Sequence, residues 1–292
     1  QLFGRNPGGA PANVLAALAR FGHQTAFLGK VGADMHGDFL RDTLMTAGID
    51  VRGLISDPEV FTTLAFVALD PGGERSFSFA RKPGADTCLR QEELDCQRLR
   101  DTRVLHIGSL SMTREPVRSA TVAAVHMARD AGAVISYDPN YRASLWPSQE
   151  AAEEQMRRLA RQADLIKLSD QETELLTGER GPRQAALALR RQGAACVAVT
   201  LGPQGALVAA GDGVVHVPGF AVTAVDTTGA GDAFWGGFLH RFLTLNVHPS
   251  ELTADRAADC ARWGNAVAAC CIRKRGAIPA MPSLREAEQM LG

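Results

Sequence analysis

The sequence has little that would tie it to a membrane, a nucleic acid or an oxidising compartment. Its formal net charge is −1, so it offers no excess of basic residues to nucleic acid or anionic lipid. No apolar run reaches the roughly 20 residues that a membrane-spanning helix requires. The six cysteines form no CxxC pair, which argues against a disulfide framework and predicts reduced, buried thiols in a cytoplasmic protein.

Several familiar catalytic signatures are also missing. In the stretch GHQTAFLGKV, Val31 follows Lys30 where a P-loop needs Ser or Thr. The protein-kinase catalytic loop, the DFG triplet and the G-x-S-x-G elbow are absent from the sequence. None of the seven histidines stands in an HExxH pattern. No G-x-G-x-x-G follows a first strand, which disfavours a redox Rossmann enzyme.

What the sequence does contain is a regular alternation of helical patterns and short apolar runs. Helices are predicted over residues 12–21, 37–47, 115–131, 148–163, 184–192, 231–245, 254–275 and 283–291. Strands are predicted for TAFLGKV, RVLHIGS, AVISYD, DLIKLS and CVAVTL. Continuous apolar strands between helices indicate an α/β fold with a doubly wound, mostly parallel central sheet flanked by helices.

One region breaks the alternation. In TTLAFVALDPGGERSFSF (62–79), two strand-like runs flank Pro71-Gly72-Gly73 with no helix between them, which predicts a β-hairpin. The hairpin could form a small β-sheet lid or an antiparallel edge of the main sheet. We expect an α/β core over 7–50 and 84–292, with 1–6 and 51–83 forming a discontinuous lid.

Polar clusters stand at the ends of the predicted strands. They are YDPNYR (137–142), KLSDQE (167–172), TLGPQG (200–205) and TTGAGD (227–232). In open α/β sheets, ligands bind beyond the carboxyl ends of the strands. Four such clusters at one edge of a sheet therefore predict a ligand site.

The TTGAGD cluster opens a long apolar helix. Gly229, Ala230 and Gly231 leave the start of that helix bare, and the unpaired N–H groups there favour a bound phosphate. Asp232 follows in the first turn, where a carboxylate beside a phosphate makes sense as the base that deprotonates an attacking hydroxyl. The alternative is a plain helix-capping aspartate after a tight glycine turn.

Together these residues resemble the ribokinase-like (PfkB) carbohydrate kinases. DTTGAGDAF (226–234) is similar to the C-terminal signature of that family, and GGAPANVLAALARFG (8–22) to its N-terminal one. The likeness extends from NPGGAPANV (6–14) to RKRGAIPAMP (273–282). Within the family, GGAPANV, FARKPGAD (79–86) and YDPNYRASLWPS (137–148) are similar to fructokinase segments.

The resemblance implies roles for the matching residues. Asp232 would be the general base, with the N–H groups of Gly229, Ala230 and Gly231 as an anion hole for the phosphoryl group. Contacts to the sugar or phosphate are implied for Gly8, Gly9, Asn13, Arg81, Asn140 and Arg142. Nucleotide contacts are implied for Lys167, Ser169, Thr200, Gly202, Gly205 and Asn265. Magnesium would lie near Glu172, and a monovalent cation, K⁺, near Asp226, Thr228, Cys271 and Gly276.

Some of these residues have simpler explanations. Asn13 could cap its helix, and Glu172 could be a first-turn helix charge. Each arginine, taken singly, is typical of a solvated surface.

The sequence also departs from the family. Ser169 stands where an asparagine is usual, and Lys82 where fructokinases have asparagine. Family members begin with a strand carrying Gly-Glu-x-x-x-Asp, whose aspartate holds sugar hydroxyls. We expect that segment to precede Gln1, because without it the sheet would lose a central strand.

The resemblance thus implies an ATP-dependent sugar kinase that uses ATP, Mg²⁺ and K⁺ and converts fructose to fructose 6-phosphate. It also implies a homodimer formed through the lid. One alternative is a kinase for 2-keto-3-deoxygluconate or an aminosugar. Another is a non-catalytic regulator that binds a sugar or a nucleotide, although a regulator would not need Asp232 as a base.

Overall fold

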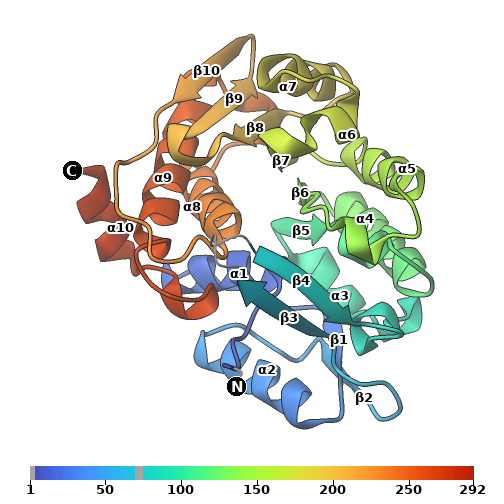
Figure 1. Cartoon of the computed structure of the whole chain (residues 1–292). Helices are drawn as coiled ribbons and strands as arrows, with labels where there is room; N and C mark the ends of the chain where they lie inside the picture. The colour runs from blue at the N-terminus through green and yellow to red at the C-terminus, as the bar shows by residue number, and fades with distance from the viewer. Residues whose placement is uncertain (1–3, 70–74) are drawn as a thin grey trace.

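The structure is a computed structural model that describes residues 4–69 and 75–292. At its centre is a six-stranded sheet with the order β10-β9-β8-β7-β6-β5 (Figure 1). The parallel strands are β5 (Val104–Gly108), β6 (Val134–Asp138), β7 (Leu165–Ser169) and β8 (Cys196–Thr200). The antiparallel strands are β9 (Ala206–Ala210) and β10 (Gly213–Val217). This confirms the predicted mostly parallel sheet, although neither β9 nor β10 was among the predicted strands.

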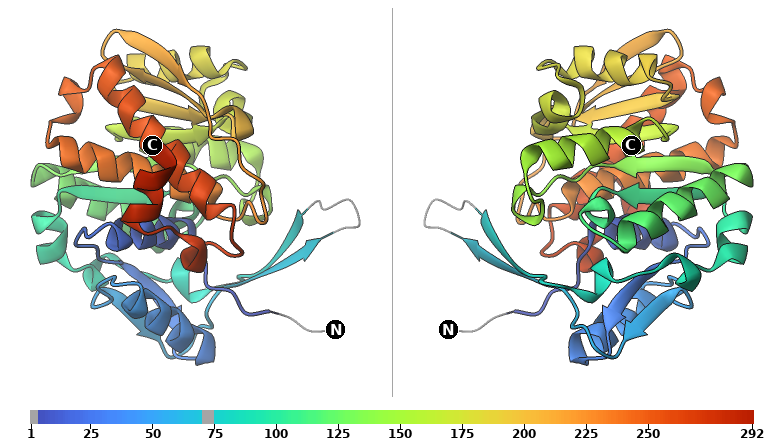
Figure 2. Two further views of the ribbon diagram at one scale, coloured as in Figure 1. Left: turned by 90° about the vertical axis from the view of Figure 1, so that its left-hand side faces the viewer. Right: turned by 90° about the vertical axis from the view of Figure 1, so that its right-hand side faces the viewer.

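Helices cover both faces of this sheet (Figures 1 and 2). One face packs against α1 (Ala10–Arg20), α8 (Ala230–Leu245) and α9 (Ala254–Cys271). The other packs against α4 (Val117–Asp130), α5 (Gln149–Ala160) and α7 (Pro182–Arg191). Successive side chains of these strands point alternately into the two cores. In β8, for example, Ala198 faces α8 and α9, whereas Val199 lies in the opposite core.

The remaining helices are peripheral or short. They are α2 (Met35–Thr46), α10 (Leu284–Leu291), α3 (Cys96–Asp101) and α6 (Thr173–Thr177). The last two were not predicted, because six and five residues are too few to show a helical period. The prediction for 254–275 was too long, because α9 ends at Cys271, before the charged run 273–275. No helix in the described ranges is long and apolar enough to span a membrane.

Two small sheets lie apart from the central one. β1 (Gly29–Gly32) pairs in parallel with β2 (Leu54–Asp57), and β3 (Leu64–Leu69) pairs antiparallel with β4 (Arg75–Ala80). Figure 2 shows the β3–β4 hairpin extending away from the rest of the chain, so it is not an edge of the main sheet. The predicted turn at 71–73 lies outside the described residues. The division into core and lid stays a prediction.

Hydrogen bonds fasten the hairpin to the core at its base. The Asp34 carboxylate accepts from the backbone N–H of Thr62 at 2.8 Å. Arg81 donates to Asp86 at 2.8 Å, to Thr113 Oγ1 at 3.1 Å and to the Leu110 carbonyl at 2.9 Å. The hairpin therefore leaves the core from a fixed base.

Candidate active site

The N-terminus of α8 is free of bulky side chains. Gly229 precedes the helix with φ of 77°, and a Cβ there would lie 2.8 Å from the Cβ of Ala277, so glycine suits this position for two reasons. The Ala230 N–H donates to the Thr227 carbonyl at 3.2 Å. A Cβ on Gly231 would lie 2.9 Å from Nζ of Lys167. The start of the helix thus lies directly beside an ammonium group.

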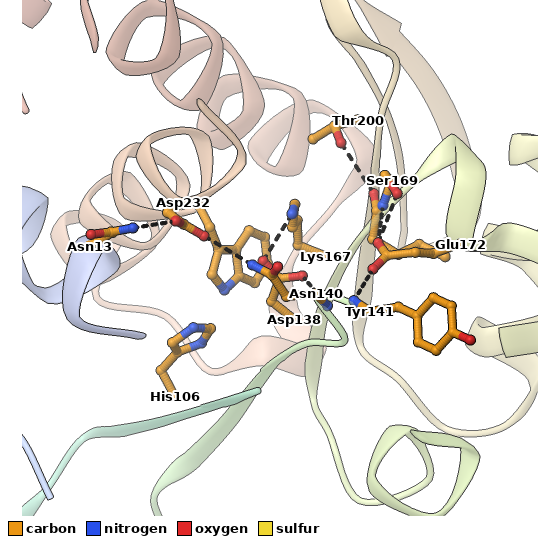
Figure 3. Close-up of polar contacts among 12 residues, drawn as sticks. Asn13, His106, Asp138, Asn140, Tyr141, Lys167, Ser169, Glu172, Thr200 and Asp232 are labelled. Carbon is orange, nitrogen blue, oxygen red and sulfur yellow. Dashed lines mark hydrogen bonds and ion pairs between the residues drawn. The ribbon is translucent and has the colours of Figure 1, made fainter. Parts of the chain in front are cut away.

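Asp232 lies in the first turn of α8 and is only 6% exposed. One carboxylate oxygen accepts from Nδ2 of Asn13 at 2.7 Å, and the other accepts from Nδ2 of Asn140 at 3.3 Å (Figure 3). Both bonds reach side chains from other elements, α1 and the loop after β6, and neither caps α8. The capping alternative therefore does not describe this aspartate.

The surroundings of Asp232 suit a base that works near neutral pH. Burial, together with the charge of nearby Asp138, raises the pKa of Asp232 to about 6. The charge of Lys167, the hydrogen bond from Asn13 and the charge of Arg142 lower that pKa in part. A carboxylate with a pKa near the working pH accepts protons more effectively than an ordinary surface aspartate.

Lys167 forms a buried ion pair with Asp138. The Nζ atom lies 2.9 Å from Oδ2, and the two side chains are 6% and 2% exposed (Figure 3). Burial alone would lower the pKa of Lys167, but the carboxylates of Asp138, Glu172 and Asp232 raise it, so the lysine is charged. Asp138 also accepts from the backbone N–H of Asn140 at 3.1 Å.

Asp138 was not among the site residues predicted from the sequence. The signal that could have found it is a charged side chain at the end of a buried, apolar, parallel strand. Such a charge needs a partner, and Lys167 is the corresponding charge in the next strand.

Glu172 is held by its own turn. Its carboxylate accepts from the N–H and the hydroxyl of Ser169, both at 2.8 Å, and from the N–H of Tyr141 at 2.7 Å. This is the first-turn role that the sequence left open, formed as a capping box. The side chain lies close enough to Lys167 to affect its pKa, so it belongs to the same polar cluster.

The residues predicted to contact a nucleotide lie near the ends of β7 and β8, in the turn after β8 and on α9. Thr200 ends β8 and donates to the Leu168 carbonyl at 3.4 Å. Gly202 and Gly205 take φ values of 57° and 94° in the turn that follows. Asn265 of α9 donates to the carbonyls of Val217 at 3.1 Å and Pro218 at 3.0 Å.

The residues predicted to hold a monovalent cation come from the loop before α8, the end of α9 and the loop that follows α9. The Asp226 carboxylate accepts from the N–H of Thr228 and from that of Gly276, both at 2.9 Å. The Cys271 carbonyl accepts from the N–H of Lys274 at 3.0 Å. Within residues 4–69 and 75–292, no cluster of three or more His, Cys, Asp and Glu is arranged to bind a metal ion.

The remaining predicted residues lie in different settings. Gly8 is exposed, and Gly9, with φ of 132°, precedes α1. Arg142 donates to the Tyr141 carbonyl at 2.8 Å and lies close enough to Asp232 to lower its pKa. Arg81 has a side chain that is only 6% exposed and is engaged at the base of the hairpin, so it is not the solvated arginine of the simpler explanation.

Comparison with known proteins finds relatives along nearly the whole chain. The sequence profile of the pfkB family carbohydrate kinases matches residues 1–284. Fructokinase-2 of Oryza sativa subsp. japonica is 41% identical over 293 residues, which cover 99% of this chain and 86% of the rice protein.

Two solved structures of Vibrio cholerae O395 fructokinase superpose with a TM-score of 0.90. The form that holds fructose, ADP and calcium is 36% identical and covers 100% of this chain and 93% of its own. A double mutant that holds fructose, ADP and potassium is 35% identical and covers 99% of this chain and 91% of its own.

Proposed function

This chain belongs to the pfkB family of carbohydrate kinases, and from that premise we propose that it is an ATP-dependent fructokinase that forms fructose 6-phosphate. Relatives that match nearly the whole chain include fructokinases from plants and bacteria. The observation that carries the proposal is Asp232, buried at the open start of α8 and beside the charged Lys167. A base next to an anion site is what the transfer of a phosphoryl group to an alcohol requires.

The residues divide the reaction between them. Asp232 would accept the proton of the C6 hydroxyl while that oxygen attacks the γ-phosphorus of ATP, and the bond to the bridging oxygen of ADP would break. Backbone N–H groups at the start of α8 and the ammonium of Lys167 would hold the transferring group. Asn13 and Asn140 orient the carboxylate through their hydrogen bonds.

The donor groups also fit the expected cations. Glu172 would hold Mg²⁺ through water, in keeping with the few protein ligands that Mg²⁺ takes. Bound magnesium would neutralise charge on the ATP phosphates. The loops around Asp226 and Gly276 would hold K⁺ through carbonyl and hydroxyl oxygens, and the Asp226 carboxylate supports that assignment.

A substrate panel tests the proposal. Ketoses, aldoses, 2-keto-3-deoxygluconate and aminosugars would be offered with ATP, with and without Mg²⁺ and K⁺, while ADP release is followed. We expect the highest kcat/KM for fructose, no turnover without Mg²⁺ and slower turnover without K⁺. If kcat/KM were higher for 2-keto-3-deoxygluconate or an aminosugar, that compound and not fructose would be the substrate. Binding of sugar and ATP without ADP release would instead favour the non-catalytic regulator.

The pKa of Asp232 predicts an acid limb in the pH profile of kcat/KM, which reports on the free enzyme. A base must be deprotonated, so kcat/KM should fall about tenfold per pH unit as the pH drops below about 6. The Asp138→Asn variant removes a neighbouring negative charge, so its limb should move to lower pH. A flat profile between pH 5 and 8, or a limb that does not move in Asp138→Asn, would contradict the assignment.

We also propose that the enzyme is a cytoplasmic homodimer joined through the β3–β4 hairpin. Six free cysteines support the location. The projecting strands and exposed Phe61 and Phe66, at 77% and 46%, support an interface between subunits. Sedimentation should give a dimer, and Phe61→Ser should shift it toward monomer. A wild-type protein that sediments as a monomer at micromolar concentration would contradict this part.

A further inference from the structure

A row of polar side chains beneath α8 takes no part in the mechanism above. Strand residues alternate between faces, and Ile107 of β5 and Ile135 of β6 lie in the core on the α4 side. Their neighbours His106 and Ser136 are partners in the β5–β6 register. His106 Nδ1 lies 3.0 Å from Ser136 Oγ, and Ser136 is 0% exposed. Figure 3 shows His106 on the same side of the sheet as Asp232.

Trp235 of α8 completes a hydrogen-bonded chain with these two residues. It lies one turn after Asp232, is fully buried, and donates from Nε1 to Ser136 Oγ at 2.8 Å. Because the indole N–H can only donate, Ser136 accepts there and can donate its own hydrogen to His106 Nδ1. Burial and the charge of Lys167 lower the pKa of His106 to about 3, so His106 is neutral and can accept that hydrogen bond.

Apolar packing also holds α8, through large buried side chains such as Phe234 and Phe238 and through close approaches to α1 and α9. A Cβ on Gly236 would lie 2.6 Å from the Cβ of Ala17 in α1, and one on Gly237 would lie 3.0 Å from the Cα of Gly264 in α9. Apolar packing of this kind holds the helices close together but is not directional. The bond from Trp235 to Ser136, in contrast, is directional and ends on a strand.

That strand also carries the anchor of Lys167. Two residues beyond Ser136, on the same face of β6, Asp138 holds Lys167 at 2.9 Å. The base and Gly231 lie on α8, and the ammonium comes from β7. β6 is therefore the element to which both halves of the site are tied.

We propose that the Trp235–Ser136–His106 chain is a positioning device, which sets the register of α8 on β6 and so places Asp232 and Gly231 against Lys167. The inference rests on the proposed function, because it requires Asp232 to be the base. A reacting group displaced by about 1 Å can lower a rate by about 10²-fold, so a modest slip of α8 is sufficient to matter.

Trp235→Phe tests the inference, since it removes the donor and keeps an aromatic ring. We expect kcat to fall by about 10- to 100-fold while KM for fructose and ATP changes by less than about threefold. Hydrolysis of ATP by water should rise relative to phosphorylation of the sugar. Ser136→Ala removes the acceptor of the same bond and should have the same effect on kcat. It also tests the inference if the Trp235→Phe protein does not fold. The double variant should be no worse than either single variant.

Phe238→Leu is the matched control. Phe238 stacks on Trp235 with ring centroids 4.6 Å apart and lies in the same core, but the substitution removes no donor or acceptor of the hydrogen-bonded chain. We expect it to lower Tm while kcat stays within about twofold of wild type. The inference would be overturned if Phe238→Leu lowered kcat by a comparable factor. It would also be overturned if the effects of Trp235→Phe and Ser136→Ala were additive, or if both of these variants had a normal kcat. A wild-type enzyme that phosphorylates no sugar would overturn the proposed function as well, whereas an active one with unaffected variants overturns only the positioning device.

Discussion

Asp232→Asn should lower kcat by about 10²- to 10⁴-fold while the protein stays folded, because it removes the base and keeps the shape of the side chain. The new amide can find partners. Asn13 donates to Asp232 at 2.7 Å, and its own Oδ1 is buried and has no hydrogen-bond partner among the residues that the structure describes. A flip of Asn13 would let that oxygen accept from the amide of the variant.

The same variant should be more stable than wild type at neutral pH. The folded-state pKa of Asp232 is raised from 3.8 to about 6, so ionised Asp232 destabilises the folded state above that range. The difference in the free energy of unfolding between Asp232→Asn and wild type should be absent below pH 4 and grow between pH 4 and 6. It should reach at most about 3 kcal/mol above pH 6. Urea unfolding at pH 4, 5, 6 and 8 measures this.

Asp95→Asn is the matched control for that experiment. Asp95 caps α3 by accepting from the N–H of Arg98 at 3.0 Å, outside the candidate site. This variant should lose at most about 1 kcal/mol of stability, because asparagine caps a helix as well as aspartate does and the surface ion pair with Arg98 contributes little, and it should keep its kcat. Near-normal turnover by Asp232→Asn would end its assignment as the base.

Lys167→Met should have the second large effect, because we expect it to lower both the stability of the protein and its kcat. It leaves the Asp138 carboxylate buried without its cation, which typically costs about 3–5 kcal/mol of stability. It also removes the ammonium beside Gly231, which should lower kcat by about 10²- to 10³-fold.

The double variant Lys167→Met/Asp138→Asn separates the two effects. With both charges removed, most of the stability should return, because the amide oxygen introduced at position 138 can still accept from the backbone N–H of Asn140. The loss of kcat should remain. If the double variant recovered wild-type turnover, the ion pair would be structural only and Lys167 would have no part in phosphoryl transfer.

The elements predictable from the sequence are those with strong local patterns. Parallel strands such as CVAVTL are continuous apolar runs, and the start of α8 follows glycines that leave the backbone bare. β9 was missed because ALVAA is rich in alanine, a poor strand former, and is held in place by pairing with β8 and β10.

The missing parts of the site depend on partners distant in sequence. Asp138 and Lys167 meet only because β6 and β7 are neighbours and both side chains lie on the α8 face. The bond between Trp235 and Ser136 joins residues 99 positions apart. Likewise, no local pattern shows that Arg81 turns toward Asp86 and Thr113 instead of solvent.

The position of Asp232 relative to the reacting oxygen tests the central claim most directly. A crystal structure with fructose, Mg²⁺ and a non-hydrolysable ATP analogue would measure it. We expect the C6 oxygen about 2.6–3.2 Å from an Asp232 carboxylate oxygen, with the γ-phosphate against the start of α8 and Nζ of Lys167. A C6 oxygen beside a different carboxylate, or a γ-phosphate away from α8, would contradict the account.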